Sequence, residues 1–122
     1  MVVNLSPIVY FRWMTDEDAL SCLAALAHPT RLAAFRLLVT GEPAGLSTGD
    51  LVEATGLSQS TFSTHLAVLV AAELVKPEKH GRQMIQRVDI ARLRALMLFL
   101  AKDCCGGSSE LCEPLIAELA CC

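Results

Sequence analysis

Apolar residues recur every three or four positions through the first half of the chain, which is the spacing of amphipathic helices. The pattern predicts helices over residues 16–27, 30–40, 47–55 and 59 to about 72. Gly41 and Gly56 follow the second and third of these ranges, as glycine often does at a helix C-terminus. Pro29 suits the first turn of the second helix, and Ser47 with Asp50 resembles a capping box with Asp in place of Glu.

The helix predicted from residue 59 has an outer face of unusual composition. Phe62, Leu66 and Leu69 form its apolar stripe. The opposite side is small and polar but uncharged, and it comprises Gln59, Ser60, Ser63, Thr64, Ala67 and Ala71. A solvated helix face usually carries Lys and Glu, whereas hydroxyl and amide groups suit contact with base edges and phosphates in a DNA groove. The alternative is that this face packs against another subunit.

Two short strands and a final helix are predicted after residue 73. Alternation and β-branched residues indicate strands at 74–78 and 84–88, joined through the basic residues 79–82. Pro77 restricts the first strand to a sheet edge. The helix predicted over residues 90–102 is apolar on more than one side, which indicates a subunit interface. The expected fold class is therefore mostly α with a small β-hairpin, in the order of a winged helix-turn-helix.

Composition sets wider limits. The chain has 122 residues, 10 basic and 13 acidic side chains, and 53% hydrophobic residues, which predicts one folded domain and excludes a disordered chain. No apolar run reaches the roughly 18 residues of a membrane span, and no signal peptide is recognisable, so we expect a cytoplasmic protein without a membrane partner. Residues 57–94 hold six basic and three acidic side chains, while each flanking segment has an excess of three acids. A local basic face can therefore contact phosphates.

Cysteine is concentrated near the end of the sequence. Five of the six cysteines lie within residues 104–122, and Cys22 alone precedes them, on an apolar helix where a core thiol is expected. Clustered cysteines in a protein that is not secreted serve more often as ligands or redox groups than as disulfides. No Ser/His/Asp arrangement, paired carboxylates or glycine-rich phosphate loop accompanies them, so we do not expect an enzyme.

Several short motifs occur in a fixed order between residues 18 and 94. They are AALAHPTR at 24–31, DL at 50–51, GLSQST at 56–61, STHL at 63–66, and AELV at 72–75 followed by GR at 81–82. Together they resemble the ArsR/SmtB family of bacterial metalloregulatory repressors. The resemblance implies residues 16–102 as the winged helix-turn-helix and dimerisation domain, 1–15 as an N-terminal extension and 103–122 as a cysteine-rich sensing segment.

The resemblance also implies how such a protein acts. A homodimer formed through the first and last helices places two recognition helices in successive major grooves of a near-palindromic double-stranded operator, with the wings on flanking backbone. An inducer then releases the repressor. The residues carried over to DNA contact are Gln59, Ser60, Ser63 and Thr64 on the helix, and Lys79, His80 and Arg82 on the wing.

The chain departs from the family at its usual sensing sites. Residues 47–54 lack the cysteine box, and Ala91 and Lys102 stand where histidines are expected on the last helix, leaving Asp89 alone. We therefore assign sensing to Cys104, Cys105 and Cys112, since three thiolates in a pyramid suit As(III) or Sb(III) as the inducer and no resident cofactor is required.

The same cysteines also suit other uses. Four thiolates from Cys104, Cys105, Cys121 and Cys122 suit tetrahedral Zn or Cd. A thiol switch that responds to oxidants or sulfide through a disulfide is another interpretation, and an inert tail is a third. A protein that sequesters metalloid without binding DNA is the alternative from a different class.

Overall fold

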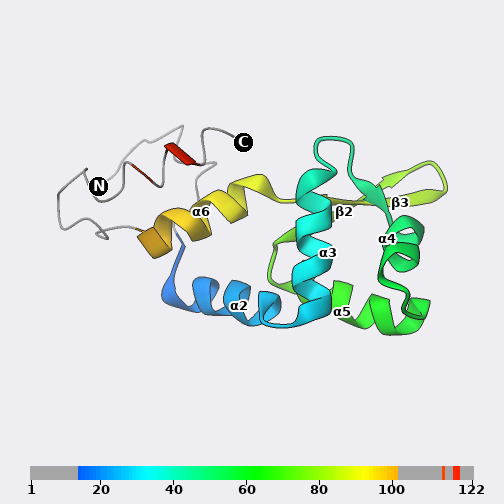
Figure 1. Cartoon of the computed structure of the whole chain (residues 1–122), viewed down its shortest axis with the longest axis horizontal. Helices are drawn as coiled ribbons and strands as arrows, with labels where there is room; N and C mark the ends of the chain where they lie inside the picture. The colour runs from blue at the N-terminus through cyan, green and yellow to red at the C-terminus, as the bar shows by residue number, and fades with distance from the viewer. Residues whose placement is uncertain (1–13, 102–113, 115–116, 119–122) are drawn as a thin grey trace.

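The computed structural model describes residues 14–101, 114 and 117–118 of the chain. Figure 1 shows α2 and α6 together at one end, α3 across the middle, and α4, α5 and the β2–β3 hairpin at the other end. This arrangement confirms the mostly helical winged-helix prediction. The elements within residues 14–101 are α2 (Asp16–Leu26), α3 (Pro29–Thr40), β1 (Leu46–Ser47), α4 (Thr48–Thr55), α5 (Gln59–Ala71), β2 (Val75–His80), β3 (Gln83–Val88) and α6 (Ile90–Ala101).

Two helices begin with reciprocal caps that local sequence explains. At α2, the Asp18 backbone N–H donates to Thr15 Oγ1 at 3.0 Å and the Thr15 N–H donates to Asp18 Oδ2 at 3.1 Å. At α4, the Asp50 N–H donates to Ser47 Oγ at 3.0 Å and the Ser47 N–H donates to Asp50 Oδ2 at 3.4 Å. The predicted capping box with Asp in the third helical position is therefore confirmed.

The three strands form an antiparallel sheet in the order β1–β3–β2. β2 is an edge strand, as predicted from Pro77, because an edge leaves room for a residue without an N–H. β1 was not predicted, since two residues are too few to show alternation. Its pairing of Leu46 with Gln86 and of Ser47 with Ile85 joins the segment before α4 to the hairpin.

The hairpin is longer than predicted, and the expected connection over residues 79–82 is wrong. Pairing continues through Lys79 with Met84 and His80 with Gln83, so that Gly81 and Arg82 alone form the turn. Gly81 has a φ of 64°, a left-handed conformation that glycine adopts without steric cost. Lys79 and His80 are thus held by the strand ladder close to the tip of the wing.

The core joins the five helices α2 to α6 and the sheet. Three groups converge near the end of α5: Arg92 Nε donates to the Ala72 carbonyl at 3.1 Å, Cys22 Sγ lies 3.7 Å from the same oxygen, and Arg92 Nη2 lies 3.6 Å from Asp18 Oδ1. Burial raises the pKa of Cys22, so its thiol stays protonated. The prediction of Cys22 as a core thiol is confirmed. The fully buried side chains include Phe62, Leu38, Leu51, Leu69, Leu74, Val75 and Val88.

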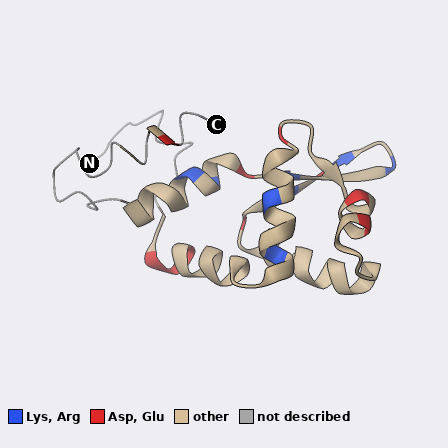
Figure 2. Ribbon diagram, in the orientation of Figure 1, with Lys and Arg blue, Asp and Glu red and all other residues tan. Residues whose placement is uncertain are grey.

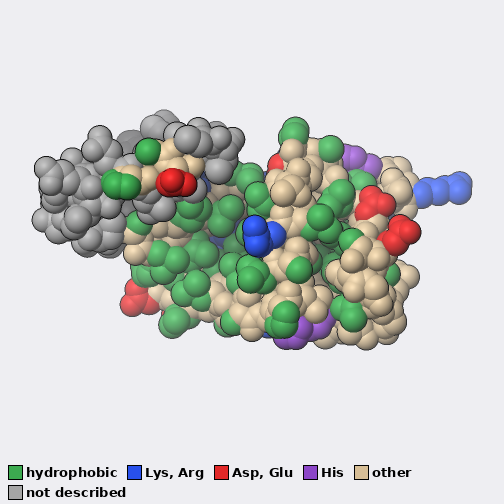
Figure 3. Space-filling model, viewed as in Figure 1, with side chains coloured by type: hydrophobic (Ala, Val, Ile, Leu, Met, Phe, Trp, Pro, Cys, Tyr) green, Lys and Arg blue, Asp and Glu red, His purple; other side chains and the backbone are tan. Residues whose placement is uncertain are grey.

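Apolar side chains remain exposed on α2 and α6. Leu20 on α2 is 65% exposed, and Leu98 and Leu100 on α6 are 51% and 55% exposed. Figure 3 shows hydrophobic side chains gathered over α2, α6 and the neighbouring part of α3.

In residues 14–101 no single helix is long and apolar enough to span a membrane, although α2 and α3 together pass that test despite a 101° bend between them.

Candidate nucleic-acid interface

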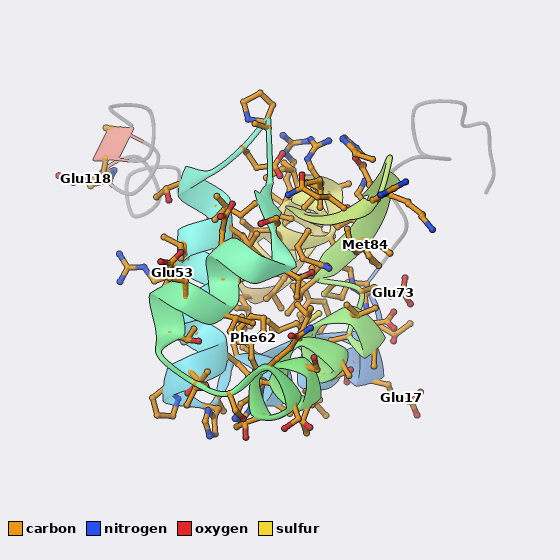
Figure 4. The ribbon with its side chains drawn as sticks, turned by 90° about the vertical axis from the view of Figure 1, so that its right-hand side faces the viewer. Glu17, Glu53, Phe62, Glu73, Met84 and Glu118 are labelled. Carbon is orange, nitrogen blue, oxygen red and sulfur yellow. The ribbon has the colours of Figure 1, made fainter. Side chains whose placement is uncertain are left out.

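The position of α5 depends on the turn that precedes it. Gly56 ends α4 with a φ of 72°, and Ser58 then caps α5 by accepting a hydrogen bond from the Thr61 N–H at 3.2 Å. The Ser58 hydroxyl also donates to Thr61 Oγ1 at 3.0 Å. Phe62 and Leu69 are fully buried, so the helix is fixed with its apolar stripe inward. Figure 4 shows Phe62 in the interior behind α4 and α5.

The outward side of α5 presents the four residues predicted from the sequence. Gln59, Ser60, Ser63 and Thr64 are all exposed. Thr64 Oγ1 donates to the Ser60 carbonyl at 3.2 Å, a bond within the helix that holds this hydroxyl in place. Figure 2 shows that α5 carries no Lys, Arg, Asp or Glu, unlike α3, α4 and α6. A helix with this surface approaches a groove without the cost of burying unpaired charge.

The wing supplies the positive charge that α5 lacks. Lys79, His80 and Arg82 are exposed at and beside the turn of the hairpin. His80 Nε2 lies 3.2 Å from Glu78 Oε1, so this ring already has a partner, whereas the structure described here gives Lys79 and Arg82 no ion pair. In Figure 4 the hairpin, α4 and α5 all face the viewer, so the neutral helix and the basic wing share one side of the molecule.

The base of the wing is held by an ion pair that local sequence did not reveal. Arg87 on β3 donates to both carboxylate oxygens of Glu42, at 2.8 and 3.0 Å, and the Val88 N–H donates to the same carboxylate at 3.2 Å. Arg87 also lies 3.5 Å from Glu78. The Arg87 guanidinium holds the pKa of Glu42 below its ordinary value, and partial burial only partly opposes this effect. Arg87 is therefore a brace for the wing rather than a free cation.

Replacing Glu42 by glutamine is expected to lower the free energy of unfolding by about 1 kcal/mol at neutral pH. The change removes two charge-assisted hydrogen bonds from Arg87, but solvent screens this partly exposed ion pair and keeps the loss small. Since the folded pKa of Glu42 is lowered, this stabilisation is present above the ordinary value of 4.5 and is lost as the pH falls through the folded value. Urea unfolding at several pH values measures this. Glu53→Gln on the exposed side of α4 is the control, and an equal effect of both changes would contradict the brace.

The predicted sensing cysteines lie outside the described residues. Within the described part, no group of three or more His, Cys, Asp or Glu side chains is placed to hold a metal ion. Asp89, the remaining candidate of the usual last-helix site, instead accepts a hydrogen bond from the Arg92 N–H at 3.1 Å and caps α6. The positions of Cys104, Cys105 and Cys112 therefore stay a prediction.

A helix-turn-helix followed by a basic β-hairpin defines a winged-helix regulator that binds DNA. Residues 26–78, which cover α3 to the start of β2, match the family described as "Helix-turn-helix domain". The chain is 32% identical over 89 residues to the HTH-type transcriptional regulator YgaV of Escherichia coli, covering 73% of this chain and 88% of that protein. The chain belongs to the ArsR/SmtB family of transcriptional regulators.

Further relatives carry more specific descriptions. The arsenical resistance operon repressor of Staphylococcus xylosus is 34% identical over 76 residues, covering 62% of this chain and 70% of that protein. A probable mercury resistance operon repressor of Streptomyces lividans is 31% identical over 90 residues, covering 66% and 70%. These relatives are transcriptional regulators rather than enzymes.

Solved structures agree with this placement. A possible transcriptional regulator for arsenical resistance has a TM-score of 0.54 at 36% identity, covering 80% of this chain and 95% of that one. The homodimeric winged helix-turn-helix DNA-binding domain of Mb0332 from Mycobacterium bovis has a TM-score of 0.57 at 25% identity, covering 84% and 92%.

Proposed function

We propose that this chain is a homodimeric repressor of an arsenic-resistance operon, released from its operator when As(III) binds the thiolates of Cys104, Cys105 and Cys112. The observation that carries the DNA-binding part is the uncharged, exposed face of α5 beside a basic wing. The inducer follows from the cysteine cluster, together with the relatives that repress arsenical and mercury resistance operons.

The division of roles follows from the chemistry of each side chain. Gln59, at the first position of α5, carries an amide that can pair with adenine, and Ser60, Ser63 and Thr64 reach base edges or phosphates through their hydroxyls. On the wing, Lys79, His80 and Arg82 contact phosphate oxygens. The helix thus supplies sequence discrimination, and the wing supplies most of the salt-dependent affinity.

Dimerisation is proposed through α2 and α6. The exposed leucines on these helices form an apolar surface that a second copy of the chain would bury, and the Mycobacterium bovis neighbour is a homodimer. Two copies then present two α5 helices to half-sites about one helical turn apart, roughly 34–36 Å. Residues 16–102 form the binding and dimerising unit in this proposal.

The sensing segment, residues 103–122, follows directly after α6. Three thiolates form a soft, anionic donor set that suits a trivalent metalloid, whereas Ca or Mg requires oxygen ligands. Because α6 belongs to the proposed dimer surface, ligand binding next to it changes the relative placement of the two α5 helices. A coupling of about 1–3 kcal/mol weakens operator binding about 5- to 150-fold.

Binding to a duplex from the upstream region of the gene tests the DNA-binding part. Wild-type affinity, followed by fluorescence anisotropy, is expected to fall steeply with salt. The Lys79→Ala/Arg82→Ala double change is expected to reduce the slope of log affinity against log salt by about 1.8, because two phosphate contacts are lost. Lys76→Ala, which removes a charge from the base of β2, is the control. Equal slopes for all three proteins would refute the role of the wing, and absence of binding would favour a sequestering protein.

A further inference from the structure

Two histidines and an arginine join three helices at the lower edge of the molecule. His28 lies in the junction between α2 and α3, Arg31 lies in the first turn of α3, and His65 lies midway along α5. The rings of His28 and His65 stack with their centroids 4.3 Å apart and their planes 37° apart. Figure 3 shows one group of histidine side chains at this edge, beneath α3.

Each ring uses its Nδ1 lone pair. His28 Nδ1 accepts from the Thr30 N–H at 3.1 Å, which makes His28 the N-cap of α3. His65 Nδ1 lies 3.3 Å from Arg31 Nη1, and a guanidinium nitrogen can only donate, so His65 Nδ1 is the acceptor. An imidazole that accepts at Nδ1 carries its single proton on Nε2 and is neutral. Both contacts therefore require the uncharged form of the ring.

Arg31 is fixed where it faces these rings. Its Nε donates to the Ala25 carbonyl at 2.6 Å and its Nη2 donates to the Ala24 carbonyl at 3.4 Å, which satisfies the C-terminal end of α2. One guanidinium thus links the last turn of α2 to the middle of α5. Because its donors are engaged on both sides, it cannot move away from a charged His65 without breaking the bonds to α2.

Among the described residues, the charged groups that act on His28 are all positive or become positive when protonated. Partial burial is the largest cause that lowers the pKa of His28, and His65 on α5 and Arg31 on α3 lower it further. The three acids of α2 lie in its first turn, at the opposite end of an 11-residue helix. The sequence of α5 contains no charged residue besides His65 when that ring is protonated. A proton on His28 therefore meets only like charge among the groups of the described residues that act on it.

We propose that the His28–His65 pair is a proton-sensitive seat for the recognition helix α5, so that protonation of either ring breaks the contacts of the neutral rings that link α5 to α2 and α3, shifts α5 on its buried apolar stripe and weakens operator binding in acid. The direction is unusual, because acid protonates surface histidines and normally strengthens binding to phosphates. The operator part of this inference rests on the proposed function, whereas its effect on stability does not.

The same two histidines are less well arranged for a metal site. A metal ion bound at Nε2 leaves the remaining proton on Nδ1, and that arrangement would cost His28 its cap on α3 and His65 its bond from Arg31. The described residues also contain no third ligand near the pair. The hydrogen bonds thus favour proton sensing over coordination.

The test compares wild type with the His28→Asn/His65→Asn double variant. Asparagine keeps an acceptor oxygen near the place of Nδ1 but does not titrate between about pH 7.5 and about pH 5.5, the range in which histidine changes charge. Over this range the dissociation constant of the wild type for the upstream duplex is expected to rise about threefold or more, and that of the double variant to change much less. His80→Gln, which removes the remaining histidine but keeps the His28–His65 pair, is the control, and its dissociation constant should still rise in acid by at least the wild-type factor, whatever its affinity at about pH 7.5.

Urea unfolding over the same pH range supplies a readout that needs no DNA. Since the folded pKa of His28 is lowered, the unfolded chain takes up protons first, and wild-type stability falls as the pH drops below about 6.5. The double variant should lose this dependence. Equal pH dependence of stability in both proteins would overturn the proton-sensitive seat. Absence of binding to the duplex at every pH would instead overturn the proposed function and leave the unfolding result to decide this inference.

Discussion

Changing Cys104 to serine is expected to abolish release from DNA by arsenite while leaving affinity for DNA without arsenite unchanged. A serine hydroxyl does not replace a cysteine thiolate as a ligand of a soft ion, so two thiolates remain where three are needed. Wild type should lose about 5- to 150-fold in affinity when arsenite is added, and the variant should lose almost none. Anisotropy titrations with and without arsenite measure the ratio directly.

Matched variants show which thiols take part. Cys105→Ser and Cys112→Ser should behave as Cys104→Ser does, whereas the Cys121→Ser/Cys122→Ser double change should respond like wild type. If Cys104→Ser, Cys105→Ser and the Cys121→Ser/Cys122→Ser double change each removed the response while Cys112→Ser kept it, a four-thiolate site for Zn or Cd would replace the three-thiolate proposal. Parallel titrations with Zn, Cd, Hg(II) and a mild oxidant distinguish metalloid sensing from the other readings of the tail. An arsenite response that survives in all these variants would remove the tail from the mechanism.

Replacing Gly45 by alanine is expected to cost about 2–4 kcal/mol of the free energy of unfolding. Gly45 has a φ of 80°, which strains any side chain. A Cβ at this position would lie 2.7 Å from Ile85 Cγ2, 2.8 Å from Arg87 Cδ and 2.8 Å from the Gln86 carbonyl oxygen. These contacts lie on β3, so relief would require β1 to separate from the sheet.

Gly56→Ala is the matched control, because it separates backbone strain from contact. Gly56 also has a left-handed φ, of 72°, but a Cβ there would meet nothing within 4 Å. Gly56→Ala should lower the free energy of unfolding by about 1 kcal/mol, which is the cost of the left-handed backbone conformation alone. Urea unfolding of both variants gives the comparison. If the two variants lost equal free energy of unfolding, the contacts of an added Cβ at position 45 with β3 would contribute nothing to the effect of Gly45→Ala.

Most of the fold could be predicted because its signals are local. A helix start depends on a cap and the three residues after it, and a helix face depends on positions three and four apart. The capping pair of Ser47 with Asp50 and the neutral outer side of α5 were therefore available from the sequence, as was the edge position of Pro77. The candidate DNA-contacting residues were found in the same way, since exposure on one side of α5 follows from burial of Phe62 and Leu69 on the other.

The features that were missed join residues far apart in the chain. β1 is two residues long and is defined only by its pairing with β3. The brace between Glu42 and Arg87 spans 45 residues, and no local pattern distinguishes either member from an ordinary surface charge. Arg92 could not be assigned as buried, because its acceptor, the carbonyl of Ala72, is a backbone group that every sequence contains.

The sequence by itself determined the order and ends of the helices, the uncharged side of α5, the basic wing and the family motifs, because each depends on residues close together in the chain. The tertiary structure alone decided how the wing is held to the α3–β1 loop through Glu42, and how His28, Arg31 and His65 join three helices. Those contacts form between segments that only folding brings together, because Glu42 and Arg87, like Arg31 and His65, lie far apart in the chain. The contact between two histidines 37 positions apart, and the approach of Arg31 to one of them, is visible only in the folded chain.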